Sequence, residues 1–422
     1  MGLSMAERRS VAKQMASRYA QASKKDKSVM LDELCALTGW TRRHARRVLV
    51  DASAPAARRA PAPRPRIYDE EVAEALRFIW ALLGAPAGKR LAPFLPEVVE
   101  VLERTGERRF PHEVRAKLVG ISAATVDRML TSERAKLRIK GRSGTKPGSI
   151  LKRQIPIRTF ADWDDAAPGF CEVDLVAHEG GHAAGEFCQT LVLTCVATGW
   201  TEPRALKNKA QRWVHEAIRD IQRTMPFPLL GLDSDNGSEF INDELFRWCE
   251  ANEITFTRSR PYRKNDNCFV EQKNFPVVRQ HVGYLRYDTD AELAVLGELY
   301  GRLRLFVNFF QPQMKLVAKT RTGAKVTKHY DTATTPYRRA LASAEVSAAA
   351  KAALAATYLA INPVSLRREI GALQDQLLEI NRTKQPKEVR RSPTPRQRFQ
   401  LRRSPSSRTF PVRQPERASR TS

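Results

Sequence analysis

Apolar residues near the N-terminus recur at the spacing of an amphipathic helix. In the stretch LDELCALTGWTRRHARRVL they occupy Leu31, Leu34, Leu37, Ala45, Val48 and Leu49. Gly39 interrupts this pattern and divides it into two short helices, as the turn of a helix-turn-helix does. The pattern therefore predicts a helix-turn-helix domain over residues 1–52.

The same pattern returns 81 residues later, in the stretch VRAKLVGISAATVDRML. Six positions correspond: Leu37, Gly39, Trp40, Thr41, Arg47 and Leu49 match Leu118, Gly120, Ile121, Ser122, Arg128 and Leu130. Thr41 and Ser122 both suit the N-cap of a second helix. We therefore predict a second helix-turn-helix domain over 68–138, after a Pro-, Ala- and Arg-rich linker at 53–67. The alternative is two ordinary helical hairpins that do not contact DNA.

Strand-like and helix-like segments alternate in the middle of the chain. A basic linker at 139–155 precedes this region, which extends over 156–310. Strands are expected at 169–178 and 186–198, then a turn that leads into a third strand within 198–206, then strands at 228–237 and 254–260. Helices are expected at 207–225, at 241–253, from about 269, and at 291–310. This alternation is typical of an α/β domain.

The C-terminal part changes character twice. Residues 311–340 alternate apolar and basic side chains around a Gly-containing turn, which predicts a small β element. Residues 341–382 have helical spacing, and 383–422 are rich in Pro, Arg and Ser, which predicts a disordered basic tail.

The charge balance points to a polyanionic partner. The 422 residues carry a formal net charge of +26, with a sequence pI of about 10.2, and a chain this basic most often binds nucleic acid. The alternative is a soluble protein with a basic tail. The basic residues also cluster in the two helix-turn-helix units and in a loop before residue 271. The candidate DNA contacts are Arg42, Arg43, Arg46, Arg47, Ser122, Thr125, Arg128, Arg258, Arg260, Arg263 and Lys264. For the loop residues, the alternative is a solvated basic loop.

Cysteine usage favours a reducing compartment. The six cysteines form no CxxC pair, and Cys188, Cys195 and Cys249 have the apolar surroundings of core residues. The sequence shows no secretory signal and no apolar stretch near the roughly 20 residues that span a membrane. We expect a cytoplasmic bacterial protein, associated with the nucleoid, with no membrane partner and no small-molecule substrate.

Three acidic residues occupy unusual positions. Asp174 lies in an apolar strand, Asp235 ends an apolar strand just before Asn-Gly, and Glu271 begins a helix after the basic loop. Charged residues in buried strands are rare unless they are paired or bind metal. Two Mg²⁺ ions, with Mn²⁺ as a substitute, would relieve the repulsion and suit phosphoryl transfer on DNA. Asp174 is then the expected bridging ligand. Asp233 is an alternative to Asp235, because it lies two residues upstream on the same face of the strand.

The segment LGLDSDNGSEFINDELFRWCEANEITFTRSRPYRKNDNCFVEQKN resembles the catalytic core of bacterial insertion-sequence DDE transposases and retroviral integrases. The S-D-N-G-x-x-F box, a helix, the PY loop and the V-E-x-x-N box follow in that order, and 35 residues separate Asp235 from Glu271. The resemblance covers about 165–290. It implies an RNase H-like fold with a catalytic, metal-binding triad of Asp174, Asp235 and Glu271. Asn274 shares a helix face with Glu271.

One further motif is weighed against this assignment. HEGGH at 178–182 matches the H-E-x-x-H pattern of zinc proteases, but its two glycines disfavour the helix that such a site needs. A turn between two strands is expected instead, and His178 either faces the active site or belongs to that turn. Retroviral integrases have an N-terminal His/Cys zinc module, whose spacing does not occur here. The family with helix-turn-helix units, the insertion-sequence transposases, is therefore the better match.

The expected fold is an α/β RNase H-like catalytic core with N-terminal all-α helix-turn-helix domains and a small C-terminal β element plus helices. The expected function is a transposase that binds the terminal inverted repeats of its element, cuts double-stranded DNA and joins the freed 3′-hydroxyl to target DNA. Such a reaction holds two DNA ends together, so a homo-oligomer is expected. The alternatives are a DNA-binding regulator with an inactive integrase-like domain and a plain nuclease that does not join strands.

Overall fold

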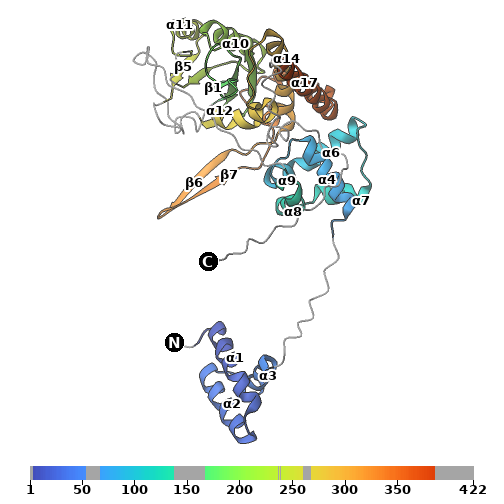
Figure 1. Cartoon of the computed structure of the whole chain (residues 1–422), viewed down its shortest axis with the longest axis vertical. Coiled ribbons are helices and arrows are strands. Elements are labelled where there is room, and N and C mark those ends of the chain that lie inside the picture. Colours follow the sequence, from blue (N-terminus) through green and yellow to red (C-terminus); the bar gives the residue numbers. More distant parts are fainter. Residues whose placement is uncertain are drawn as a thin grey trace, which may run out of the picture. The chain divides into compact units, whose positions relative to one another are not determined.

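The computed structural model describes residues 3–53, 67–136, 167–235, 237, 239–259 and 268–384. The chain divides into two compact units, Met1–Ile67 and Tyr68–Ser422 (Figure 1). The predicted linker at 139–155 lies outside the described residues, as do most of the linker at 53–67 and nearly all of the basic tail. No helix of the described part is long and apolar enough to cross a bilayer.

The N-terminal unit consists of helices α1 (Met5–Gln21), α2 (Lys24–Thr38) and α3 (Arg42–Ser53). Its small core is formed by Ala12, Ala16, Tyr19, Leu31, Leu34, Ala45 and Leu49. Gly39 ends α2 with φ at 70°, a conformation that glycine adopts without strain. The predicted helix–Gly–helix arrangement is therefore present.

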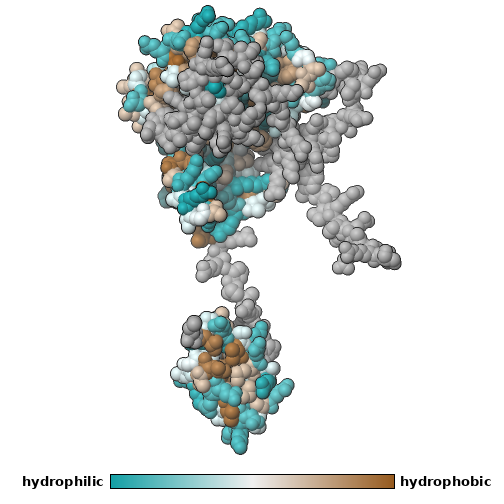
Figure 2. All heavy atoms as spheres, turned by 90° about the vertical axis from the view of Figure 1, so that its left-hand side faces the viewer, coloured by the Kyte–Doolittle hydropathy of each residue, from teal (hydrophilic) through white to brown (hydrophobic). Residues whose placement is uncertain are grey.

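Leu37, one of the apolar positions of the helical pattern, does not belong to this core. It is 57% exposed, and Met5, Val29 and Val50 are also exposed. Figure 2 shows apolar side chains gathered on a face of this unit. Leu37 follows Leu34 by three positions, but α2 is packed only through a narrow stripe that includes Leu31 and Leu34, so Leu37 falls outside it.

A helical module begins the second unit. It consists of α4 (Glu70–Leu82), α5 (Gly88–Leu91), η1 (Ala92–Phe94), α6 (Leu95–Arg104), α7 (His112–Val119), α8 (Ala123–Met129) and α9 (Thr131–Ala135). Ser122 is the N-cap of α8 and accepts a hydrogen bond from the Thr125 amide. Gly120 has φ at −91°, so the turn between α7 and α8 does not repeat the left-handed turn at Gly39.

A five-stranded mixed sheet forms the centre of the second unit. Its strands are β1 (Phe170–Ala177), β2 (Gln189–Cys195), β3 (Thr201–Leu206), β4 (Gly231–Ser234) and β5 (Thr255–Arg258). The order is β3-β2-β1-β4-β5. The β1–β2 and β2–β3 pairs are antiparallel, whereas β1–β4 and β4–β5 are parallel. Every residue of β2 is buried, as its unbroken apolar and threonine-rich sequence predicts.

Helices cover both faces of this sheet (Figure 1). One face is covered by α10 (Gln211–Thr224) and α11 (Asp243–Ala251). The other face is covered by α12 (Cys268–Lys273), the π-helix η3 (Asn274–Arg279), α13 (Gln280–Val282) and α14 (Asp290–Phe310). Asn242 is the N-cap of α11 and accepts a hydrogen bond from the Leu245 amide.

The C-terminal part adds a hairpin and three helices. These are β6 (Leu316–Thr322), β7 (Lys325–Tyr330), α15 (Pro336–Ala342), α16 (Ala348–Ala360) and α17 (Pro363–Thr383). The predicted small β element and the predicted helices are thus present. With the mixed sheet and the N-terminal helices, they confirm the predicted fold class.

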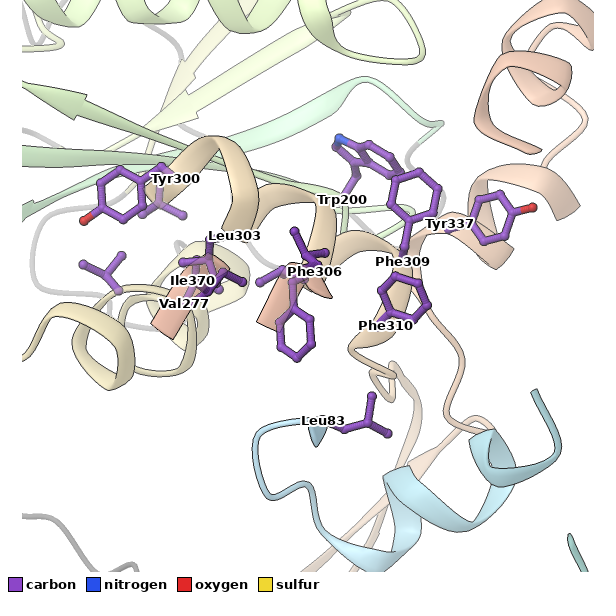
Figure 3. Packing of buried hydrophobic residues seen from close by; sticks show 14 of the residues in the cluster. Leu83, Trp200, Val277, Tyr300, Leu303, Phe306, Phe309, Phe310, Tyr337 and Ile370 are labelled. Carbon is purple, nitrogen blue, oxygen red and sulfur yellow. The ribbon is translucent and has the colours of Figure 1, made fainter. Parts of the chain in front are cut away.

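Helix α14 joins the sheet to the elements around it. Figure 3 shows its Phe309 beside Trp200 of the sheet and Tyr337 of α15, while Phe310 faces Leu83 at the end of α4. Phe309 and Phe310 are at most 1% exposed. Burying aromatic side chains of this size contributes strongly to stability, so the helical module is fixed to the central sheet through one shared core.

Candidate active site

Four carboxylates lie on one face of two adjacent parallel strands. Glu172 of β1 is in register with Asp233 of β4. Side chains alternate along a strand, so Asp174 lies on the same face as Glu172, and Asp235 follows Asp233 in the same way. Glu172 and Asp233 are fully buried, whereas Asp174 and Asp235 are only partly buried. The parallel pairing therefore brings Asp174 and Asp235 to one end of the sheet, beside the buried pair of Glu172 and Asp233.

Asp174 is held by two hydrogen bonds. Its Oδ1 accepts from the Leu175 amide at 2.8 Å, and its Oδ2 accepts from Nδ2 of Asn274 at 2.7 Å. Burial raises the pKa of Asp174 to about 7, the Asn274 contact opposes this rise, and the charges of Asp235 and Glu271 reinforce it. The negative charges of both other predicted triad members, Asp235 and Glu271, therefore act on Asp174.

Asp235 and Asp233 have different surroundings. Asp235 accepts a hydrogen bond from the Gly237 amide at 2.8 Å, and burial raises its pKa. Asp233 is fully buried and accepts from Oγ1 of Thr257 on β5 at 2.5 Å. Solvent therefore reaches Asp235 and not Asp233. Since a metal ligand must be accessible to the ion, these surroundings favour Asp235 over Asp233 as the ligand.

Glu239 is a further acid beside this end of the sheet. It is partly buried, its pKa is raised first by burial, and the charge of Asp235 contributes to the rise. We did not expect this residue, although its place in the S-D-N-G-x-x-F box was a usable signal.

Glu271 is exposed on α12, and its helix is fixed from below by Glu172. Oε2 of Glu172 accepts from the Val270 amide at 2.9 Å. Burial raises the pKa of Glu172 well above its ordinary range, with the amide contact opposing the rise and Asp233 reinforcing it. Sequence reasoning missed Glu172, although it lies two residues before Asp174 in the same apolar strand.

The chemistry of these side chains fits a hard divalent cation. All the donors are carboxylate oxygens, which Mg²⁺ prefers. Burial raises the pKa values of Asp174 and Asp235, and the charges of Asp235 and Glu271 add to the rise at Asp174. Within the described ranges, however, no three Asp, Glu, His or Cys side chains are gathered closely enough to hold a metal ion. The donor set therefore supports a cation, and the side-chain positions do not define its geometry.

His178 belongs to the core and does not reach this group. It is fully buried, and its Nε2 lies 2.7 Å from Oγ1 of Thr190. Burial lowers its pKa to about 3. Gly180 and Gly181 form a turn with positive φ, so the HEGGH stretch is a turn between strands, as predicted.

The two predicted DNA-reading helices present polar side chains to solvent. On α3, Arg43, Arg46 and Arg47 are exposed, and Arg42 is paired with Asp32 of α2.

On α8, Oγ of Ser122 lies 2.9 Å from Oγ1 of Thr125, which also accepts a hydrogen bond from Arg128 at 3.0 Å. Ser122 and Arg128 are exposed. In each unit the predicted residues thus share an outward-facing surface.

The basic loop before α12 is described only in part. Arg260, Arg263 and Lys264 lie outside the described residues. Arg258 is only 8% exposed at the end of β5, which differs from the solvent-exposed phosphate contact that the sequence suggested. Its place in β5, paired with the central strand β4, removes it from the surface.

The sheet defines the fold. A mixed five-stranded sheet in the order β3-β2-β1-β4-β5, in which β2 alone runs opposite to the other strands, is the arrangement of the predicted RNase H-like fold. The two central strands carry the acids at their ends.

The chain belongs to the same family as the uncharacterized protein y4rM of Sinorhizobium fredii (strain NBRC 101917 / NGR234). The two are 43% identical over 338 residues, which cover 80% of this chain and 96% of that protein. No protein-family model matches the chain.

Three solved integrase structures are also similar. The catalytic core domain of BIV integrase is 17% identical and covers 41% of this chain and 93% of its own, with a TM-score of 0.26. The HTLV-2 integrase core in complex with magnesium is 15% identical and covers 35% and 90%, with a TM-score of 0.27. The simian T-cell lymphotropic virus intasome in complex with PP2A regulatory subunit B56 gamma is 14% identical and covers 51% and 69%, with a TM-score of 0.29. These scores are low, and the fold assignment rests on the strand order itself.

Proposed function

We propose that this protein is a DNA transposase that cuts and joins DNA strands at Asp174, Asp235 and Glu271. The observation that carries the proposal is the convergence of charge at Asp174. Asp235 and Glu271 both raise its pKa, although they come from two other elements of the chain. Gathering carboxylates at an accessible strand end is a costly arrangement, which a bound cation would make favourable.

Each residue has a distinct role in this proposal. Asp174, Asp235 and Glu271 would hold two Mg²⁺ ions, or Mn²⁺ as a substitute. When bound, these ions would activate the attacking water or 3′-hydroxyl and neutralise the phosphate. Asn274 orients the Asp174 carboxylate through Nδ2. Glu172 holds the start of α12 through the Val270 amide and so positions Glu271.

The helical units would bring DNA to this site. The exposed arginines of α3 suit phosphate or major-groove contacts at the ends of an element, and the outward side of α8 suits a second contact. Cutting and joining two ends in one reaction requires two active sites held together. We therefore propose a homo-oligomer assembled on double-stranded DNA.

The test uses the full chain and end-labelled duplexes that carry the inverted repeats flanking its gene. Nicking and joining to a plasmid are followed with Mg²⁺, Mn²⁺ or EDTA. Asp174→Asn, Asp235→Asn and Glu271→Gln are each expected to reduce both reactions by at least about 100-fold, because each removes a charged ligand of the proposed cations. Glu216→Gln, at an exposed acid of α10, is the matched control and should retain activity.

Three results would overturn the proposal. If strand cleavage with Mg²⁺ survives all three substitutions, the carboxylates are not catalytic. If the unmodified protein binds the duplexes but neither cuts nor joins them, it is a DNA-binding regulator with an inactive integrase-like domain. Cleavage without joining from a pre-cut end would identify a plain nuclease.

A further inference from the structure

The β6–β7 hairpin is exposed along almost its whole length. Every residue from Val317 to Tyr330 is exposed, and only Leu316 at its base is partly buried. Figure 1 shows this hairpin projecting away from the body of its unit. An isolated two-stranded ribbon is marginally stable in water. Packing within the described part of the chain therefore does not account for this ribbon.

The charge of the hairpin is of one sign. Residues 312–330 contain Lys315, Lys319, Arg321, Lys325 and Lys328 and no acid. Lys319 and Lys328 are directly opposite one another in the register. Like charges at opposed positions destabilise a β pair, so this sequence weakens the free hairpin.

The positive charge is concentrated on one face. Alternation along the strands places Lys319, Arg321 and Lys328 on the same face of the ribbon. Thr320 and His329 are on the other face, where Oγ1 and Nε2 lie 3.1 Å apart, together with Lys325 opposite Thr322. One face thus carries three of the four Lys and Arg side chains of the two strands.

The base of the hairpin is anchored. Asp331 accepts from the Lys315 amide at 2.6 Å and from Arg339 of α15 at 2.7 Å. The Lys315 ammonium donates to the Ala197 carbonyl between β2 and β3 at 2.8 Å. A fixed base holds the projecting part in a defined direction from the body.

The base of the hairpin is also joined to the helix that carries Glu271. Nζ of Lys273, at the end of α12, donates a hydrogen bond to Oε1 of Gln313, three residues before β6. The hairpin therefore leaves the body next to the helix on which the proposed chemistry depends.

We propose that the β6–β7 hairpin is a DNA-binding arm whose cationic face contacts the phosphates of duplex DNA. A two-stranded ribbon fits the major groove, which is about 12 Å wide. A strand of seven residues reaches roughly 23 Å at about 3.3 Å per residue. The arm holds the duplex on which the neighbouring carboxylates act, so this inference rests on the proposed function and adds a DNA contact to it.

The test is the salt dependence of DNA binding by the full chain. The triple variant Lys319→Ser, Arg321→Ser, Lys328→Ser removes the cationic face. The matched control Arg212→Ser, Arg219→Ser, Arg223→Ser removes the same charge from exposed positions on α10. Fluorescence anisotropy with a labelled duplex gives the logarithm of the binding constant against the logarithm of the salt concentration. Thermal melting of each variant checks that it folds.

Three lost phosphate contacts reduce this slope by about 2 to 3, since each contributes about 0.9. Raising salt from about 50 to about 200 mM should then weaken the unmodified protein roughly 40-fold more than the hairpin variant. If the slope of the hairpin variant equals that of the unmodified protein or that of the α10 control, the inference is overturned. An effect seen only with single-stranded DNA also overturns it.

The same measurements separate the two proposals. Asp174→Asn should bind DNA with an unchanged hairpin-dependent slope while it fails to cut. If the unmodified protein shows this slope but never cuts, the arm stands and the catalytic proposal falls. If it cuts with full activity and the slope does not depend on the hairpin, the catalytic proposal stands and the arm falls.

Discussion

Replacing Asp174 by asparagine should stabilise the protein at neutral pH while it removes a proposed metal ligand. The carboxylate accepts from the Leu175 amide and from Nδ2 of Asn274. An asparagine keeps one acceptor for the Leu175 amide but turns an amide toward Asn274. Oδ1 of Asn274 has no hydrogen-bond partner among the described residues. A half-turn of the Asn274 amide therefore restores the contact with little cost.

The magnitude follows from the pKa of Asp174. It rises from 3.8 to about 7, roughly three units, and each unit corresponds to about 1.36 kcal/mol. Since the carboxylate is partly exposed, we take about 2 kcal/mol of the full 4 kcal/mol as its cost when ionised. An acid with a raised pKa favours the folded state at low pH and loses that contribution as pH rises. The loss therefore develops between about pH 4 and about pH 7.

Thermal melting of both proteins in EDTA from pH 5 to 8.5 measures this effect. At pH 8 the Asp174→Asn variant should melt about 4 to 8 °C higher than the unmodified protein, and the gap should narrow toward pH 5. Asp243→Asn, at an exposed position at the start of α11, is the control and should shift little. Mg²⁺ should raise the melting temperature of the unmodified protein alone. A variant that is destabilised equally at both ends of the pH range would refute the reasoning.

Three further changes test the surroundings of the site. Glu172→Ala leaves a buried amide without its acceptor and should cost about 1–3 kcal/mol of the free energy of unfolding, measured with urea, whereas Glu172→Gln should restore most of it. Gly180→Ala places a Cβ 2.7 Å from a neighbouring backbone nitrogen at positive φ, so urea unfolding should show a loss of about 2–4 kcal/mol. Gly181→Ala meets no atom within 4 Å and should lose only about 1 kcal/mol; equal losses at both positions would contradict the predicted clash. Asn274→Ala removes a contact that lowers the pKa of Asp174, so the midpoint of melting temperature against pH should move upward, and an unchanged midpoint would contradict the role of that contact.

The elements of the catalytic sheet were predictable because their patterns are local. Strands β1, β2 and β4 are short apolar runs bounded by Gly or turn residues, and α10 and α11 have clear apolar stripes. Three acids in or beside those runs were visible without any pairing information. The S-D-N-G-x-x-F and V-E-x-x-N boxes then related two of them to one another.

Contacts between distant segments were not predictable in this way. Glu172 and Val270 are 98 positions apart, and Asp174 and Asn274 are 100 apart. Both contacts depend on α12 and the start of η3 lying against β1, which no local pattern encodes. His178 is a similar case, since its burial depends on Thr190 and on the packing of Tyr287.

The apparent repeat of the helix-turn-helix shows why matching residues can mislead. Gly39 and Gly120 align in sequence, but only Gly39 adopts positive φ. Likewise, Leu37 is exposed while its counterpart Leu118 is fully buried. The helical module that contains Leu118 shares its core with α14 and the sheet, whereas the three-helix unit has a core of its own. The apolar residues of the module therefore have packing partners that the three-helix unit lacks.

The distribution of charge links the carboxylates to the basic surfaces. A phosphate backbone is repelled by the acids at the ends of β1 and β4, and it is attracted by the arginines of α3 and by the basic hairpin. Since the Debye length is about 8 Å at physiological salt, basic groups farther away than this cannot offset the acids at the reacting phosphate itself. The proposed DNA binding and the proposed chemistry therefore need separate sources of positive charge: basic side chains along the duplex, and a cation at the carboxylates.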